Sequence, residues 1–277
     1  MNIAFWSPMH GTGTTSALLA LSVAYSEMER KKILLTQTHY NLNNLEYPLL
    51  GDVREDDFFR DTGIDAALRL FKSGNVTEGQ LTDCTIKIGK NLYLLAGTHS
   101  SNREGFESDM IKSMIIHILR IAGEFYDVVF TDTNSGVSGY SMKILEESDA
   151  VVVSLNQNLF MLDSFLNSER LKDKKVFYLF TDYDHKRKYN IKNISAKYKQ
   201  IGKSNSGIIP HSAHFADSIC DKKVYGYITD NLDCDSDHAD YGFFSELKDT
   251  TDKLGRFLET VKSGKTKRTE DDKWYGS

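Results

Sequence analysis

Proline and cysteine are scarce in this chain, and long hydrophobic runs are missing. Three prolines in 277 residues rule out a proline-rich linker, so we expect one compact domain. The three cysteines, Cys84, Cys220 and Cys234, are odd in number and widely spaced. They argue against a disulfide framework or a cysteine zinc site and favour a reducing, cytoplasmic setting. The longest apolar segments have the length of strands, so we expect no membrane span.

A large excess of charge of one sign is also missing. The chain carries 34 Lys and Arg residues against 39 Asp and Glu residues, a formal net charge of −5, with acids and bases interspersed. This balance gives no strong signal for a protein that coats nucleic acid. The first strand runs directly into a loop, so we expect no signal peptide. Overall, 40% hydrophobic and 26% charged residues fit a globular chain long enough for one α/β domain.

The segment from Ile3 to Ser16 is the most informative part of the chain. A short apolar strand at 2–6 is followed by a loop with two glycines and then by an apolar-periodic helix. Glycines let backbone N–H groups approach an anion, and a helix N-terminus presents unpaired N–H donors. An ordinary strand-to-helix turn that needs glycine for its backbone geometry is the alternative. The expected phosphate-binding residues are Gly11, Thr12, Gly13, Thr14, Thr15 and Ser16.

A Walker A loop ends in Gly-Lys-Ser/Thr, whereas this loop ends in Gly13, Thr14 and Thr15. The lysine that contacts the β- and γ-phosphates is therefore absent. A hydroxyl at the start of the helix remains to reach a magnesium ion, and Thr15 is our candidate. The expected strand 126–132 ends in Asp132, which is placed to hold a magnesium-bound water as a Walker B acid does. A helix cap or a turn-forming aspartate is the alternative for Asp132.

The rest of the chain alternates buried strands with helices. The first strand, its helix and a strand at 31–36 form a βαβ unit, which predicts a parallel sheet with a right-handed crossover. We therefore predict an α/β fold, a doubly wound, mostly parallel sheet flanked by helices, as in P-loop NTPases. Further strands are expected at 84–88, 91–97, 150–155, 175–181 and 207–210.

Two segments lie outside this alternation. The polar, asparagine-rich stretch 37–50 is expected to be a loop at the carboxyl end of a strand, where ligands bind in open α/β sheets. A last helix at 243–261 is expected to pack on the sheet and to close a nucleotide-binding domain of residues 1–261. The charged segment 262–277 is expected to be a disordered tail.

In order and spacing, these segments resemble the ParA/MinD family of ATPases with a deviant Walker A motif. Residues 9–16 match the family's Lys-Gly-Gly-x-Gly-Lys-Thr-Thr frame, and residues 127–136 are similar to its Asp-Tyr-Val-Ile-Ile-Asp-Thr-Pro-Ala-Gly. Residues 31–39 lie where the family has a strand ending in Asp-x-Asp, and 208–210 is similar to a late Val-Ile-Pro near which adenine lies. The frame of residues 7–15 looks closest to the TadZ/CpaE branch, whose members position pilus machinery.

The resemblance implies a protein that binds ATP or ADP with Mg²⁺ and acts as a localisation, partition or assembly factor. It adds Thr181, Asp182 and Pro210 to the nucleotide contacts, and it assigns Thr15 and Asp132 to the metal. It also implies protein partners in a pilus, secretion or segregation complex. A second copy of the chain is one such partner, because the family dimerises around nucleotide.

The departures from the family concern charge. The family's two lysines are Met9 and Thr14 here, and its switch I aspartates are Gln37 and His39, of which His39 replaces a catalytic acid. Cations at a transferring phosphoryl group are worth orders of magnitude in rate. We therefore expect nucleotide binding with weak or no hydrolysis, a pseudo-ATPase. The alternatives are an active ATPase whose lysine comes from elsewhere, such as Lys143 or a partner subunit, and an interaction scaffold without nucleotide.

Overall fold

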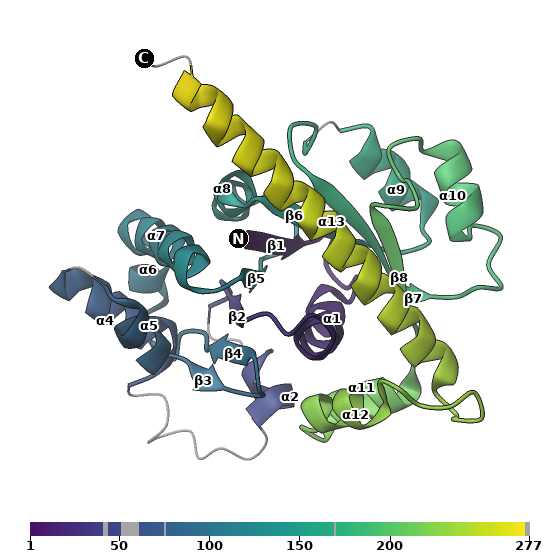
Figure 1. The fold of residues 1–277 in the computed structure, drawn as a ribbon, viewed down its shortest axis with the longest axis horizontal. Coiled ribbons are helices and arrows are strands. Elements are labelled where there is room, and N and C mark those ends of the chain that lie inside the picture. Colours follow the sequence, from purple (N-terminus) through teal and green to yellow (C-terminus); the bar gives the residue numbers. More distant parts are fainter. Residues whose placement is uncertain (41–43, 51–60, 75, 169, 275–277) are drawn as a thin grey trace.

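The computed structural model describes residues 1–40, 44–50, 61–74, 76–168 and 170–274. Its strands are β1 (Asn2–Trp6), β2 (Ile33–Gln37), β3 (Ile86–Lys87), β4 (Leu92–Leu95), β5 (Val128–Asp132), β6 (Ala150–Leu155), β7 (Val176–Tyr183) and β8 (Ser206–Pro210). They form one eight-stranded sheet in the order β3-β4-β2-β5-β1-β6-β7-β8 (Figure 1). Neighbouring strands are parallel except for β3 and β4, which pair antiparallel. The mostly parallel α/β fold predicted from the sequence is confirmed.

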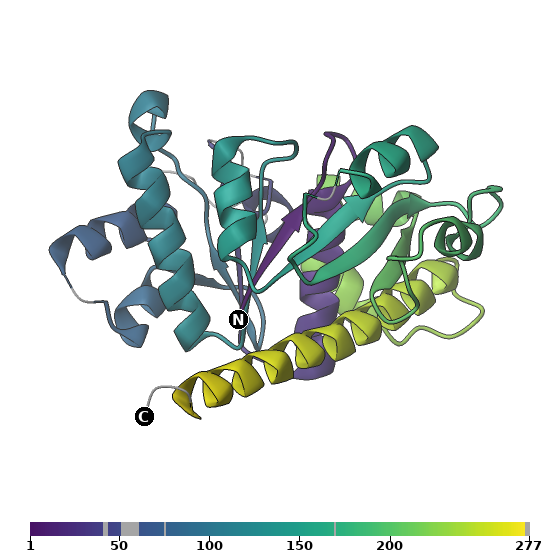
Figure 2. The same cartoon turned by 90° about the horizontal axis from the view of Figure 1, so that it is seen from above.

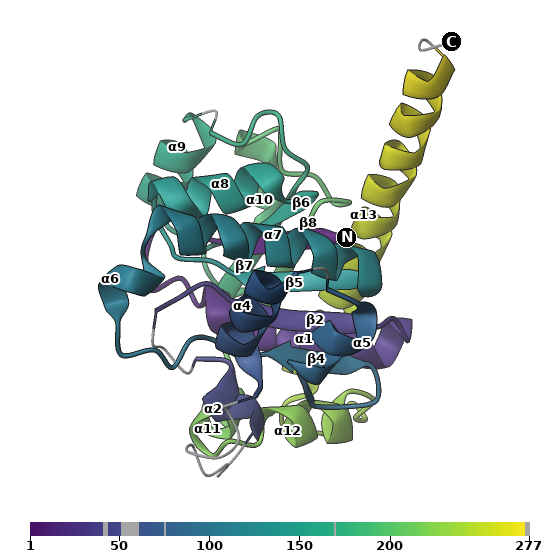
Figure 3. The same cartoon turned by 90° about the vertical axis from the view of Figure 1, so that its left-hand side faces the viewer.

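Helices cover both faces of this sheet (Figure 3). They are α1 (Thr14–Glu29), α2 (Glu46–Leu50), α4 (Gly63–Ser73), α5 (Glu78–Asp83), α6 (Arg103–Phe106), α7 (Asp109–Phe125), α8 (Gly139–Glu147), α9 (Leu159–Leu166), α10 (Ile191–Lys197), α11 (Ala213–Cys220), α12 (Val224–Asn231) and α13 (Tyr241–Trp274). One face packs against α1, α12 and α13, and the other against α4, α7, α8 and α9. In the described part of the chain, no helix is long and apolar enough to cross a bilayer.

The central strands read as continuous apolar runs because they are buried on both sides. Along β2, Ile33 and Leu35 join the core beneath α1, whereas Leu34 between them joins the core beneath α7. Alternating side chains of one strand therefore fill two different layers, as expected for a parallel sheet covered by helices. Because these strands are parallel, the carboxyl ends of β2, β5 and β1 lie side by side at one edge of the sheet.

Two sequence expectations fail at the boundaries of elements. The stretch 37–50, expected to be a loop, ends in the short helix α2. The last helix, expected to end at Val261 before a disordered tail, continues to Trp274 as α13, whose end projects beyond the sheet (Figure 3). The segment after Val261 lacks proline, so a helix that has already begun can continue through it, although Gly264 is unfavourable in a helix.

Helix α13 crosses the sheet face and packs on it through residues 243–261 (Figure 2). Phe257 lies with its ring centroid 5.6 Å from that of Phe177 in β7, and Thr250 Oγ1 accepts the backbone N–H of Ile208 in β8 at 2.9 Å. Val261 is 5% exposed, whereas the residues 262–264 that follow it are exposed. The packed part of the helix therefore ends at Val261.

We expect a chain truncated after Lys262 to melt within about 2 °C of the full chain, because surface residues without buried contacts contribute little to stability. Thermal unfolding of the two chains measures this difference. Truncation after Arg256, which removes Phe257, Leu258 and Val261 from the core, is the positive control and should lower the melting temperature strongly. A large loss on truncation after Lys262 would mean that the end of α13 is docked.

Candidate functional site

The loop between β1 and α1 has a conformation that depends on its two glycines. Gly11 and Gly13 have φ values of 75° and 71°, in the left-handed region that glycine adopts without strain. Gly13 is the N-cap of α1, and no side chain caps this helix end. Among the described residues, no acceptor pairs with the backbone N–H groups of Thr14 and Thr15. The start of α1 therefore presents free donors and a positive dipole end to an anion.

The loop rests on β7 through Thr181. The Thr181 Oγ1 is within hydrogen-bonding distance of the carbonyl oxygen of Thr12 and lies 3.1 Å from that of Leu155. The Oγ1 atoms of Thr12 and Thr14 lie 3.1 Å apart and are buried with their side chains. These hydroxyls are thus used to hold the loop, and Thr181, expected to bind nucleotide, supports the loop from beneath.

The structure brings together the two residues that the sequence predicts for magnesium. Thr15 Oγ1, on the first turn of α1, donates a hydrogen bond of 2.6 Å to Oδ2 of Asp132 at the end of β5. Asp132 is 1% exposed, and its carbonyl oxygen accepts the N–H and the Oγ1 of Thr38 at 3.0 and 3.2 Å. Ser16 lies half-buried on the same turn of α1. Thr38 after β2 therefore holds the Asp132 backbone, and the start of α1 holds one oxygen of its carboxyl.

Burial controls the protonation of this site. Burial raises the pKa of Asp132 to about 7, against the opposing effect of the Thr15 hydrogen bond. His39 Nδ1 lies 3.9 Å from Asp132 Oδ2, but burial, and in second place the nearby His10, lower the pKa of His39 to about 4. His39 is therefore neutral at pH 7, and the two side chains do not form an ion pair. No cation from His39 replaces the missing lysine.

The site fits a magnesium ion carried by phosphate better than a dedicated metal cage. Oδ1 of Asp132 and Nδ1 of His39 are buried and lack a hydrogen-bond partner in the described structure. Mg²⁺ keeps several waters and commonly binds through one or two carboxylates together with substrate phosphates. The described residues contain no cluster of three or more His, Cys, Asp or Glu side chains that would hold a metal by themselves. Thr15 and Asp132 are the residues that would hold the ion.

The remaining predicted nucleotide contacts lie further along the same sheet edge. Asp182 has a φ of 49°, is exposed, and its Oδ1 lies 2.9 Å from Nδ1 of His211. Pro210 ends β8 and pairs in register with Tyr183 of β7. Asp182 and Pro210 are therefore neighbours of each other at the ends of β7 and β8. In the sheet, β1 and β6 separate these strands from β5, which carries Asp132.

One buried acid at this edge, Glu46 of α2, could not be predicted from the sequence. Glu46 is 3% exposed, and Gln37 Nε2 donates to both of its carboxylate oxygens, at 2.8 and 3.0 Å. The backbone N–H of Gly97 donates to Oε1 of the same carboxylate. Burial raises the pKa of Glu46, and these hydrogen bonds oppose that rise. Glu46 stands in the segment expected to be a loop, where a lone glutamate carries no motif.

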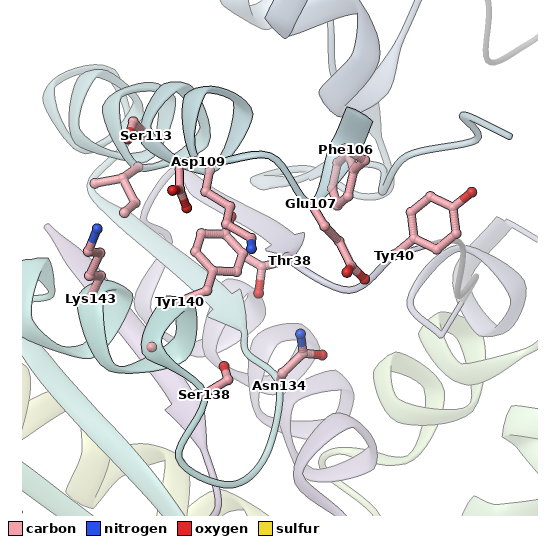
Figure 4. A pocket seen from close by; sticks show the side chains of 13 residues that line it. Thr38, Tyr40, Phe106, Glu107, Asp109, Ser113, Asn134, Ser138, Tyr140 and Lys143 are labelled. Carbon is pink, nitrogen blue, oxygen red and sulfur yellow. The ribbon is translucent and has the colours of Figure 1, made fainter. Parts of the chain in front are cut away.

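A cavity of about 410 Å³ opens beside the site between α6, α7 and α8 (Figure 4). Thr38 and Asn134, which follow β2 and β5, line one part of it, and Lys143 of α8 lines another. Figure 4 shows the Tyr140 ring between Lys143 and Asn134. Lys112 Nζ lies 5.7 Å from the centroid of that ring. Lys143, considered above as a substitute lysine, therefore shares a cavity with the neighbours of the Asp132 site.

No sequence-family model matches this chain, and no curated protein matches it in sequence. Its structure is similar to that of a ParA family ATPase from Chlorobium tepidum, with a TM-score of 0.69, 14% identity, and coverage of 90% of this chain and 98% of the other. It is also similar to a plasmid partition protein from Borrelia burgdorferi bound to AMPPNP, with a TM-score of 0.62, 18% identity, and coverage of 94% of this chain and 98% of the other. The septum site-determining protein MinD of Pyrococcus horikoshii with Mg-ADP has a TM-score of 0.67 and 17% identity, with coverage of 92% of this chain and 96% of the other. The chain has the fold of the ParA/MinD P-loop ATPases.

Proposed function

We propose that this chain is a ParA/MinD-like nucleotide-binding protein that acts as a localisation, partition or assembly factor and hydrolyses ATP weakly or not at all. The observation that carries the proposal is the Thr15–Asp132 hydrogen bond of 2.6 Å at the uncapped start of α1. A hydroxyl and a carboxyl meet there beside free backbone donors, which is the arrangement needed for a magnesium-bound polyphosphate. The frame of residues 7–15 supports the TadZ/CpaE-like branch of the family.

The charge of the loop supports binding without efficient chemistry. No lysine or arginine occurs from Ser7 to Ser16, and His39 is neutral at pH 7. Backbone donors, the helix dipole and Mg²⁺ must therefore offset the charge of the phosphates. Removing charge-stabilising groups from a transferring phosphoryl group costs orders of magnitude in rate, whereas ground-state binding keeps its backbone contacts.

We expect the purified protein to bind ATP with magnesium and to turn it over far more slowly than its active relatives. A calorimetric titration with ATP and with ADP, each with Mg²⁺ and with EDTA, measures binding. A phosphate-release assay on the same sample then measures turnover. Absence of binding at millimolar ATP with Mg²⁺ would favour an interaction scaffold without nucleotide, and ordinary turnover would favour an active ATPase.

The active-ATPase alternative has one specific candidate within the chain, Lys143. Its place in the cavity that Asn134 also lines supports it as a source of positive charge for a bound phosphate. If the wild-type protein is active, Lys143→Ala should remove most of the activity, and Lys112→Ala serves as its neighbour control. For partners, we propose proteins of a pilus, secretion or segregation complex in the cytoplasm, with a second copy of the chain among them.

A further inference from the structure

Glu46 is more deeply buried than a glutamate at a helix start needs to be. It begins α2, yet only 3% of its surface is exposed, and its carboxylate reaches two other elements. Gln37 at the end of β2 donates to it twice, and Gly97 after β4 donates once through its backbone. Buried carboxylates are costly unless several donors satisfy them. Two other segments of the chain thus donate hydrogen bonds to one acid.

The contacts of this carboxylate favour its ionised form and oppose the effect of burial. Its two partners, the Gln37 amide nitrogen and the Gly97 N–H, are donors, so the oxygens act only as acceptors. A carboxylate that accepts hydrogen bonds on both oxygens is favoured in its ionised form. Glu46 therefore contributes a negative charge to the interior of this sheet edge.

Gln37 links this charge to the candidate metal site. In the sheet, Gln37 lies in register with Asp132 on the neighbouring strand. Leu35 and Phe130 face α1, and Gln37 and Asp132 stand two residues after them on the same strands. Because side chains two residues apart on a strand share a face, Gln37 and Asp132 also project toward α1. A Cβ built on Gly97 would lie 2.7 Å from Gln37 Nε2, so the backbone there encloses the amide closely. One continuous polar row therefore runs from Glu46 through Gln37 and Asp132 to Thr15.

We propose that Glu46 is a positioning residue of the nucleotide site, which holds Gln37 beside Asp132 and adds a second negative charge that makes nucleotide binding strictly dependent on a divalent cation. The proposal rests on the proposed nucleotide-binding function. Glu46 thus supplies a buried acid from α2 at the edge of the sheet where Gln37 and His39, in and after β2, occupy the family's acidic positions.

The electrostatic consequence differs between free ATP and its magnesium complex. With no lysine or arginine in the loop, a metal-free polyphosphate is repelled by Glu46 and by ionised Asp132. A bound Mg²⁺ is instead attracted by both. Removing the charge of Glu46 should therefore weaken Mg-ATP binding and spare or strengthen the binding of ATP in EDTA. A purely structural contact would weaken both to the same extent.

The test compares the ratio of the ATP dissociation constants in EDTA and in Mg²⁺ for wild type and Glu46→Gln at pH 8. We expect the ratio to fall about tenfold in the variant, the order expected from one charge in a partly buried site. Glu78→Gln is the matched control, because Glu78 is exposed on α5 and pairs with Lys32 at the opposite end of the strands. Its ratio should equal that of wild type.

Gln37→Met provides a second variant that does not alter Glu46 itself. It removes both amide donors while keeping the side-chain length, and it should lower the same ratio. The double variant should lose less than the product of the two single effects, because the residues act as one unit. If Glu46→Gln does not fold by circular dichroism, Gln37→Met carries the test.

The outcomes separate this inference from the proposed function. A wild-type protein that binds no nucleotide overturns both. A wild-type protein that binds Mg-ATP, together with variants that change the EDTA and Mg²⁺ affinities by equal factors, overturns the inference about Glu46 alone. A lowered ratio in Glu46→Gln and Gln37→Met, with Glu78→Gln unchanged, supports it.

Discussion

Replacing Asp132 by asparagine is expected to raise the free energy of unfolding of the nucleotide-free protein by roughly 2–4 kcal/mol at pH 8. Asp132 is 1% exposed, and burial raises its pKa to about 7 from an ordinary value of 3.8. Above pH 7 the folded chain must therefore hold a buried carboxylate whose Oδ1 has no hydrogen-bond partner among the described residues. Asparagine has nearly the same shape and carries no charge. Loss of magnesium-dependent nucleotide binding should accompany the gain in stability.

The sign and the pH window follow from proton linkage. Between about pH 4 and pH 7 the folded protein binds the Asp132 proton and the unfolded chain has already lost it. The stability contributed by this proton is complete below pH 4 and is lost as the pH rises through 7. Asp132→Asn should therefore change stability little at pH 4, increasingly between pH 4 and 7, and by a constant amount above that. Denaturant titrations at pH 4.5, 6 and 8 would measure the difference.

His39 produces the opposite trend in nearly the same window. Burial lowers its pKa to about 4, so the folded protein keeps it neutral while the unfolded chain takes up a proton below about pH 6.5. Its stability contribution is complete above pH 6.5 and is lost as the pH falls toward 4. In the wild-type protein the two trends partly cancel. In Asp132→Asn, the acid sensitivity due to His39 should become visible.

Asp127→Asn is the matched control for Asp132→Asn. Asp127 precedes the same strand at its other end, is exposed, and accepts the backbone N–H of Lys32 at 2.8 Å. The same chemical change there should not stabilise the protein at pH 8. A uniform effect of Asp132→Asn at all three pH values would contradict the burial argument, and so would a loss of stability at pH 8.

Thr14→Lys is expected to tighten ATP binding by about tenfold or more in the presence of magnesium. Thr14 occupies the position of the Walker lysine and lies on the first turn of α1, beside the free N–H groups. A lysine at this position contacts β- and γ-phosphate oxygens through charge-assisted hydrogen bonds. The substitution also removes the hydrogen bond between the Oγ1 atoms of Thr12 and Thr14, which are 3.1 Å apart, and this loss costs less free energy than the new phosphate contacts contribute. Calorimetry on wild type and variant measures the change.

Hydrolysis should rise only slightly in Thr14→Lys, because a neutral His39 still stands at the position of the family's acid. Adding His39→Asp tests whether the two losses act as one unit, in which case the double variant gains more than the two single variants together. Met110→Lys adds the same charge on α7 at a side chain that is 62% exposed, and it should leave both quantities unchanged. Equal tightening by Met110→Lys would mean that net charge, and not the loop, controls binding.

The core of the fold was predictable because its signal is local. The segments that form β1, β5, β6 and β7 are short apolar runs bounded by turns. Such runs are typical of strands that are buried on both faces of a parallel sheet. Short helices such as α5, α8 and α12 were not predictable, because their apolar positions are too few to define a period. Helix α13 was expected to end at its last buried residue, but a helix that has formed adds one hydrogen bond for each further residue and can continue past its packed part.

In the candidate site, too, the local features were predictable from the sequence and the long-range contacts were not. The loop at 11–16 and Asp132 could be proposed from the sequence, because a strand–loop–helix order and an acid at a strand end are patterns within a few residues of each other. The supporting contacts could not, since Thr181 lies 169 residues from the Thr12 carbonyl that it contacts. Glu46 meets Gly97 across 51 positions, and a lone glutamate in a polar stretch gives no sign of such a contact.

The sheet, the glycine loop, the absence of both lysines and the acid that ends β5 could be identified from the sequence, because each depends on consecutive residues. The charges that the site carries depend instead on the folded packing. Burial keeps His39 neutral and raises the pKa of Asp132 to about 7, and Gln37 and Gly97, from two distant chain segments, donate hydrogen bonds to the Glu46 carboxylate. Desolvation depends on the neighbours that packing brings together from distant parts of the chain, and no local pattern records them.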